Sequence, residues 1–203
     1  MSRLVFYIVL IAIAVGLTQC SPGQDRQDVN IPYDAIQEGD LVFRRGEGIV
    51  SNLVVYNDAN GRYSHVGVVV KCDTSLLVVH SVPGEGDDKL DRVRAVTLQD
   101  FFSNDHAMIG EVMRVPLDSV QLCELSCRAM DKAEQKVAFD HNYDLEDTTK
   151  LYCTELIQLL FSNIGVDLAQ GRSTHIGIPA FMGDYIMPSD IYQNSDLKSI
   201  FIF

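Results

Sequence analysis

Two valine-rich segments near the middle of the chain constrain its fold more than any other feature. Residues 64–70 read SHVGVVV and residues 76–82 read LLVVHSV, with only a short polar link between them. β-Branched residues are enriched in strands because they pack well on a pleated surface. The two segments therefore predict neighbouring antiparallel strands joined as a hairpin, with residues 71–74 as its loop.

The other apolar patterns add strands and helices to this hairpin. Short strands are predicted at residues 39–43, 92–96, 108–115 and 200–203. Apolar residues recur at three- and four-residue spacing in residues 118–136 and 151–164, which predicts two amphipathic helices with a polar loop between them. A shorter helix is predicted at residues 49–56. The pattern indicates an α+β domain, in which about five or six mostly antiparallel strands are covered by helices.

The first 20 residues have the pattern of an export signal. One basic residue, Arg3, precedes an apolar run that is shorter than the roughly 20 residues of a membrane span. The run ends in LTQC, which resembles a bacterial lipobox, so Cys20 is the expected lipidation site and mature N-terminus. An uncleaved anchor helix is the alternative. Both interpretations place the domain in a bacterial cell envelope, held at a membrane on the periplasmic or outer-membrane face.

The segment after Cys20 differs in composition from the rest of the chain. It begins SPGQDRQDVN and lacks apolar periodicity, which predicts a flexible tether over residues 21–34. Residues 35–203 are then long enough for one domain with a full hydrophobic core. The chain has a formal net charge of −12, and an acidic domain repels phosphate backbones, so nucleic acid is not an expected partner.

The cysteines do not form a metal-binding pattern. Beyond Cys20 they are Cys72, Cys123, Cys127 and Cys153, with no CxxC spacing and no neighbouring histidine cluster. The cysteines therefore do not predict a zinc site. Cys123 and Cys127 share a face of one predicted helix, where parallel Cβ vectors oppose a disulfide. They are predicted to be two small buried residues.

Cys153 stands at the start of the second long predicted helix, directly after the polar loop. Backbone N–H groups at a helix N-terminus stabilise a thiolate and can lower a cysteine pKa from about 8.5 to between about 3.5 and 7.5. The thiolate is the reactive form, so this position makes Cys153 a candidate nucleophile. The alternative is a buried and inert thiol, which is the usual state of a free cysteine.

Two histidines lie in the predicted hairpin. If Val70 faces Ser75, the same register places His65 directly opposite His80. One imidazole then fixes the tautomer and orientation of the other, as the third member of a catalytic triad does. A register shift of one residue would separate them to opposite faces. The alternatives are two histidines satisfied by water or backbone, or a metal site, for which two histidines without a nearby carboxylate are thin evidence.

Four motifs together resemble a known enzyme family. GDLVF at residues 39–43, SHVGVVV at residues 64–70 and VVHSV at residues 78–82 resemble the block of NlpC-type cell-wall cysteine peptidases that carries the base and the third polar residue. The nucleophile normally precedes this block, whereas here YCTELI follows it at residues 152–157. This order resembles the circularly permuted branch, the YiiX/YaeF-like permuted papain-like amidases. The resemblance covers about residues 35–203.

The resemblance implies a permuted papain-like fold and a cysteine hydrolase. Cys153 would be the nucleophile, His65 the general base and His80 the orienting third residue. The implied reaction is acyl transfer through an acyl-enzyme on a peptide-type amide, such as that of a cell-wall peptide, without a metal or cofactor. The alternatives are a lipid-directed thiol acyltransferase or phospholipase, which also pair a cysteine with two histidines, and a non-catalytic envelope binding lipoprotein. An apolar groove beside Cys153 would favour lipid, and a polar, acidic groove would favour peptide amines.

Several other polar residues have expected roles. The backbone N–H of Cys153 is the expected oxyanion donor, and Tyr56 and Tyr152 are candidates for a second donor, with plain packing as the alternative. Arg44 and Arg45 follow a predicted strand and are expected to be exposed, with contact to a substrate carboxylate as the alternative. Glu155 is expected to be structural, because helix geometry points it away from Cys153.

Overall fold

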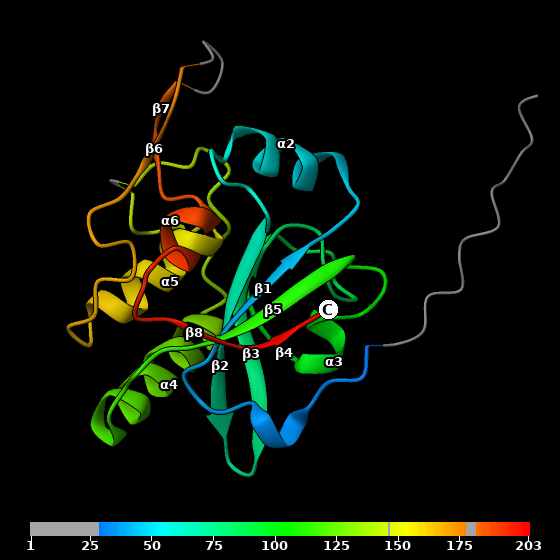
Figure 1. Ribbon diagram of the computed structural model, residues 1–203, viewed down its shortest axis with the longest axis vertical. Helices are drawn as coiled ribbons and strands as arrows, with labels where there is room; N and C mark the ends of the chain where they lie inside the picture. The colour runs from blue at the N-terminus through cyan, green and yellow to red at the C-terminus, as the bar shows by residue number, and fades with distance from the viewer. Residues whose placement is uncertain (1–28, 146, 178–181) are drawn as a thin grey trace, which may run out of the picture.

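An antiparallel sheet forms the centre of the molecule. The computed structural model describes residues 29–145, 147–177 and 182–203. In this part of the chain, one sheet has six strands in the order β4-β3-β2-β1-β5-β8, and all neighbours are antiparallel (Figure 1). Its strands are β1 (Leu41–Arg45), β2 (His65–Cys72), β3 (Ser75–Val82), β4 (Arg92–Thr97), β5 (Ile109–Arg114) and β8 (Lys198–Ile202). The predicted antiparallel sheet is confirmed.

The hairpin of β2 and β3 is tighter than the sequence predicted. Cys72 pairs with Ser75, so only residues 73 and 74 form the turn. Asp73 has a φ of 54°, a positive backbone angle of the kind that two-residue hairpin turns use. The predicted pairing of Val70 with Ser75 is therefore wrong by two residues.

Two helices cover one face of the sheet. They are α4 (Ser119–Glu134) and α5 (Cys153–Ser162), and they pack against β2, β3 and β4 (Figure 1). The carboxylate of Asp118 accepts hydrogen bonds from the N–H groups of Val120 and Gln121, which sets the start of α4. Both long helices predicted from periodicity are confirmed. Their apolar side chains form the larger hydrophobic core with the inward side chains of β1, β2 and β3.

The outer face of α4 corrects the prediction for Cys123 and Cys127, which are both exposed. The buried apolar residues of this helix are Leu125 and Ala129, each two positions after a cysteine. A separation of two residues turns the helix by about 200°, so the cysteines lie on the side away from the sheet. The prediction that these two cysteines are buried is therefore wrong.

A second, smaller core covers the opposite face of the sheet. It joins Phe101 of α3 (Leu98–Phe101) to side chains of β1, β2 and β3.

The chain before β1 contributes to this core as well. Val29 packs against it, and Ile31 is 5% exposed, just before the short helix η1 (Tyr33–Ala35). Packed chain thus begins upstream of residue 35, within the segment assigned to the tether. Cys20 and the export signal lie outside the described residues.

Three further elements surround one end of the sheet. Helix α2 (Ile49–Asn57) connects β1 to β2, the hairpin of β6 (Thr174–Ile176) and β7 (Gly183–Tyr185) rises beside it, and α6 (Pro188–Tyr192) follows (Figure 1). No residue of α2 is buried. None of the helices in the described ranges is long and apolar enough to cross a membrane.

Candidate active site

The predicted nucleophile, Cys153, is the first residue of α5. Two hydrogen bonds tie the chain on either side of it to other elements. The hydroxyl of Ser81 on β3 donates to the carbonyl oxygen of Leu151 at 2.5 Å, and the hydroxyl of Thr154 donates to the carbonyl oxygen of Ile186 at 2.5 Å. The start of the helix is therefore held in a defined position relative to β3.

Burial is the largest influence on the Cys153 thiol and raises its pKa to about 11. The backbone N–H groups of Val66, Thr154 and Cys153 interact with the sulfur and act in the opposite direction, as does the charge of Arg44. The helix-start argument predicted a lowered pKa, and it is wrong here because desolvation outweighs these interactions. Although Cys153 keeps some exposed surface, its thiol is protonated at neutral pH.

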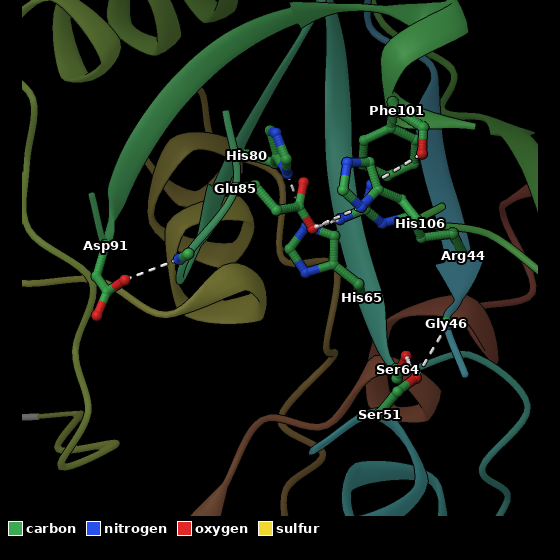
Figure 2. Close-up of polar contacts among 11 residues, drawn as sticks. Arg44, Gly46, Ser51, Ser64, His65, His80, Glu85, Asp91, Phe101 and His106 are labelled. Carbon is green, nitrogen blue, oxygen red and sulfur yellow. Dashed lines mark hydrogen bonds and ion pairs between the residues drawn. The ribbon is translucent and has the colours of Figure 1, made fainter. Parts of the chain in front are cut away.

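His65 and His80 lie on the same face of the β2–β3 pair (Figure 2). Nε2 of His65 is 2.8 Å from Nδ1 of His80, and the ring centroids are 5.1 Å apart. The register error did not break this predicted contact, because a shift of two residues keeps each side chain on its face and makes the pair diagonal. The register places Gly67 opposite His80. A Cβ at Gly67 would approach the His80 Cβ to 3.2 Å, so glycine provides the room.

Both imidazoles are buried, with 9% of His65 and 0% of His80 exposed. Burial is the main reason why the pKa of each lies well below that of a free histidine, and the charge of Arg44 adds to the effect. The ring of Phe101 on α3 packs against both, at centroid distances of 5.8 Å from His65 and 5.3 Å from His80. The two histidines are therefore uncharged at neutral pH.

Arg44 is the site residue that sequence reasoning missed. It was expected to be exposed, but it is 3% exposed and pairs directly with His65 across β1 and β2. Its Nη1 donates to the carbonyl oxygen of Phe101 at 2.8 Å, its Nη2 bonds the carboxylate of Glu85, and its guanidinium lies 4.5 Å from the Phe101 ring centroid (Figure 2). The alternation of β1 carried the signal, because Arg44 shares a face with the buried Val42.

An apolar groove lies beside α2, and one of its walls, Tyr143, contacts the residue that precedes the cysteine. Its volume is about 310 Å³, and it lies between α2 and the β6–β7 hairpin, with walls that include Val50, Leu53, Tyr143 and Tyr185. Tyr143 packs on Tyr152, the residue before the cysteine, with ring centroids 5.3 Å apart. Burial raises the pKa of Tyr143, and Cys153 has a smaller effect in the same direction.

The candidates for a second oxyanion donor are placed differently from each other. Tyr56 is 84% exposed on α2. The Tyr152 hydroxyl is buried, and it accepts a hydrogen bond from the N–H of Ile186 at 3.2 Å.

Glu155 accepts a hydrogen bond from the N–H of Tyr152 at 3.3 Å and so caps α5, in agreement with a structural role. Burial raises the pKa of Glu155 to about 7.

The other histidines lie outside this cluster or at its edge. His141 and His175 each pair with an exposed carboxylate. Nδ1 of His106 lies 3.7 Å from the Glu85 carboxylate, so this residue borders the Arg44 side of the site. The predicted lipidation site, Cys20, lies in the part of the chain that is not described.

Comparisons with known proteins agree with this fold. The chain is similar in fold to the crystal structure of the metalloprotein YiiX from Escherichia coli O157:H7, with a TM-score of 0.66 and 17% identity over 81% of this chain and 96% of that one. No curated protein matches the chain. A model of the permuted papain-like amidase enzymes matches residues 35–179. The chain therefore belongs to the permuted papain-like amidase family of YaeF and YiiX, the C92 family.

Proposed function

We propose that this protein is a cysteine hydrolase in which Cys153 attacks a carbonyl carbon, His65 acts as the base and His80 orients His65. Membership of the family supports a cysteine hydrolase in general. The observation that carries the finer assignment is the hydrogen bond between His65 and His80. The N–H of Val66, the residue after His65, interacts with the Cys153 sulfur, so the backbone of β2 next to the proposed base contacts the proposed nucleophile, which supports the assignment.

The tautomer of His65 follows from this arrangement. His65 Nε2 is engaged with His80 Nδ1, so Nδ1 is the nitrogen of His65 that can serve the thiol. For Nδ1 to be basic, neutral His65 must carry its proton on Nε2 and donate it to His80 Nδ1. His80 then carries its own proton on Nε2, an atom without a hydrogen-bond partner in the described residues. His80 thereby fixes the ring orientation and the tautomer together.

The reaction starts from two neutral groups. Because the thiol and the imidazole are both uncharged at rest, His65 takes the thiol proton as the sulfur attacks the carbonyl carbon. The backbone N–H of Cys153 points to the sulfur and can donate to the developing oxyanion. His65 returns the proton to the leaving amine or alcohol as its bond to carbon breaks. Water then hydrolyses the thioester, which releases the acid and restores the thiol.

The substrate of the first proposal is a peptide-type amide, such as a cell-wall peptide. The family's amidase description supports an amide bond. The export signal and lipobox-like sequence support a membrane-held protein in the cell envelope, with Cys20 as the lipidated residue.

A second candidate, a lipid-directed thiol acyltransferase or phospholipase, is favoured by the groove. The groove walls are almost wholly apolar, whereas a binding site for peptide amines would be polar and acidic. Its volume of about 310 Å³ lies within the usual range for small-molecule sites. The acyl group of such a substrate would lie against Leu53 and Tyr143 while its carbonyl meets Cys153.

The term metalloprotein describes the E. coli relative, and the described residues of the candidate site do not fit a bound metal. In the described ranges, no three His, Cys, Asp or Glu side chains are grouped to hold a metal ion. The two site histidines bond each other instead. No step of the proposed reaction is assigned to a metal.

Trapping of the acyl-enzyme tests the proposal. The full chain would be incubated with a panel of peptide amides and fatty-acyl esters, quenched in acid and mapped by mass spectrometry. We expect an acyl adduct on Cys153 that is lost in His65→Ala and retained in His175→Ala, a control on the exposed hairpin. The bond type that forms the adduct separates the amidase from the lipid candidate. Absence of both adduct and turnover across the panel would leave the non-catalytic binding protein as the better description.

A further inference from the structure

We propose that Arg44 is a positioning residue for the Cys153–His65 pair: a buried cation, paired with His65 across two strands, whose charge opposes a positive charge on the imidazole and favours a negative charge on the thiol, with Glu85 as the counterion that limits its effect. The inference rests on the proposed function, because it assigns Arg44 a role in the chemistry of that site. It concerns how the site is charged and is independent of which acyl group the site accepts.

The position of Arg44 is fixed by contacts on each side of the guanidinium. The main chain of Arg44 pairs with that of His65, so the two side chains leave adjacent strands on the same face. Nη1 is hydrogen-bonded to the carbonyl oxygen of Phe101, and the guanidinium lies over the ring of that residue. The same ring packs on both histidines, so the cation and the imidazoles share one wall. An arginine held in this way presents its charge in a constant place.

The charge of Arg44 acts on the pair in two directions. It disfavours a second positive charge nearby, which lowers the pKa of His65 after the larger effect of burial. It favours a negative charge on sulfur, which opposes the effect of burial on the Cys153 thiol. An imidazole that is uncharged at rest can accept the thiol proton, and the cation favours the thiolate that remains. The same cation disfavours the imidazolium that forms, and the negative charge of Glu85 offsets part of that cost.

Glu85 limits this effect. Its carboxylate, 18% exposed, bonds Nη2 of Arg44 and lies 3.7 Å from Nδ1 of His106 (Figure 2). A negative charge at this place partly cancels the field of the guanidinium at the histidines. Removing the charge of Glu85 should therefore shift the ionisation of the Cys153 thiol in the direction opposite to the shift caused by removing the charge of Arg44.

The charged and titratable groups around the pair come from several elements. They are Arg44 on β1, His80 on β3, Glu85 after β3, Arg94 on β4, His106 after α3 and Cys153 on α5. Arg94 pairs with His80 across the strands, but its Nη2 is bonded to the carboxylate of Asp88. Arg44 is the cation that acts on the thiol and on both imidazoles.

The test is the rate of Cys153 alkylation by iodoacetamide in the full chain, measured from about pH 6 to about pH 10. This range lies below the Cys153 pKa of about 11, so the rate rises with the thiolate fraction throughout it. Because His65 is uncharged throughout this range, the profile reports the thiol. The exposed Cys123 and Cys127 serve as internal reference thiols in the same sample. The variants are Arg44→Met, Arg44→Lys and Glu85→Gln.

We expect Arg44→Met to move the Cys153 profile to higher pH and Glu85→Gln to move it to lower pH. The thiolate fraction changes tenfold for each unit of pKa, and the opposing change in nucleophilicity leaves about a threefold change in rate at fixed pH. Arg44→Lys keeps the charge and should remain closer to wild type than Arg44→Met. Arg45→Met is the matched control, since Arg45 is the next residue on the strand and bonds Asn52 on α2.

The two variants separate an electrostatic role from a structural one. Loss of structure would change Cys153 reactivity in the same direction in Arg44→Met and Glu85→Gln, and that result, or the absence of any shift in either, would overturn the inference. Wild-type protein that forms the His65-dependent acyl adduct but shows no opposite shifts would retain the proposed function and lose only the role of Arg44. Wild-type protein without the adduct would instead contradict the proposed function.

Discussion

The two sides of the candidate site are built differently. The histidine side lies on the central strands, where His65, His80 and Arg44 are buried. The two histidines are hydrogen-bonded to each other, and Arg44 is hydrogen-bonded to the carbonyl oxygen of Phe101. The groove side is formed by α2 and the β6–β7 hairpin, and α2 has no buried residue. Leu53 on α2 is 52% exposed even though it lines the groove.

This difference assigns a separate task to each side. Proton transfer and nucleophilic attack need groups held within a fraction of an ångström, which packed strands provide. Binding of an apolar chain needs only apolar area, which an exposed helix can supply. Variants on the strand side should therefore stop the reaction, whereas variants on the groove side should change which substrate reacts. The following predictions test this division, beginning with the largest effect.

Cys153→Ser should abolish hydrolysis, with a loss of about 10⁴-fold or more, because a serine hydroxyl is a far weaker nucleophile beside a base adapted to a thiol. The change is nearly isosteric, so the thermal unfolding midpoint should stay close to that of wild type. Turnover and calorimetry measure the two quantities. Retention of wild-type turnover would exclude the thiol as the reacting group.

His80→Ala should lower kcat by about 10²-fold, at the lower end of what general base catalysis contributes, because His65 loses the bond that fixes its tautomer. The control is His141→Ala, in which an exposed histidine bonded to Asp91 is removed. Steady-state kinetics on the substrate found by acyl-enzyme trapping gives kcat for both. Equal activities in the two variants would contradict an orienting role for His80.

The buried histidines should make folding depend on pH. Their pKa values are lowered in the folded state, so below about pH 6.5 the unfolded chain binds more protons than the native chain. The free energy of unfolding should then fall by about 1.4 kcal/mol per pH unit for each histidine as the pH decreases, and the contribution is constant above that pH. Urea unfolding at several pH values measures this slope.

His80→Phe keeps an aromatic ring against Phe101 and removes one titrating group. The free energy of unfolding of this variant should therefore change less with pH than that of wild type. His175→Ala removes an exposed histidine and should keep the wild-type slope. Parallel curves for wild type and His80→Phe would show that His80 can be protonated within the folded protein.

Leu53→Asp should reduce the advantage of longer acyl chains without changing alkylation of Cys153 by iodoacetamide. Each methylene that leaves water contributes about 0.8 kcal/mol, or about fourfold in kcat/KM, and a carboxylate in the groove opposes this burial. An acyl-ester series of increasing length measures the effect. Val120→Asp is the control, because Val120 is 71% exposed and lies on α4, at the end of the molecule away from α2 (Figure 1). Equal chain-length dependence in both variants would mean that the groove does not bind the acyl chain.

The sequence alone determined those features that depend on neighbours along the chain. The valines of residues 64–70 and 76–82 predicted two paired strands, and three- and four-residue spacing predicted the helix that begins at Cys153. The contact of His65 with His80 was predicted even from a register that was two residues wrong. Strand alternation has a period of two, so an error of two residues preserves the face on which a side chain lies.

Only the tertiary structure decided how these residues are charged. Burial of Cys153 depends on how α5 packs against β2, and it reversed the pKa shift that the helix start alone predicts. Arg44 looked like an exposed residue in sequence, and its partners Glu85 and Phe101 come from segments far along the chain. Periodicity is a property of a few consecutive residues, whereas desolvation and electrostatic interactions depend on which distant segments meet.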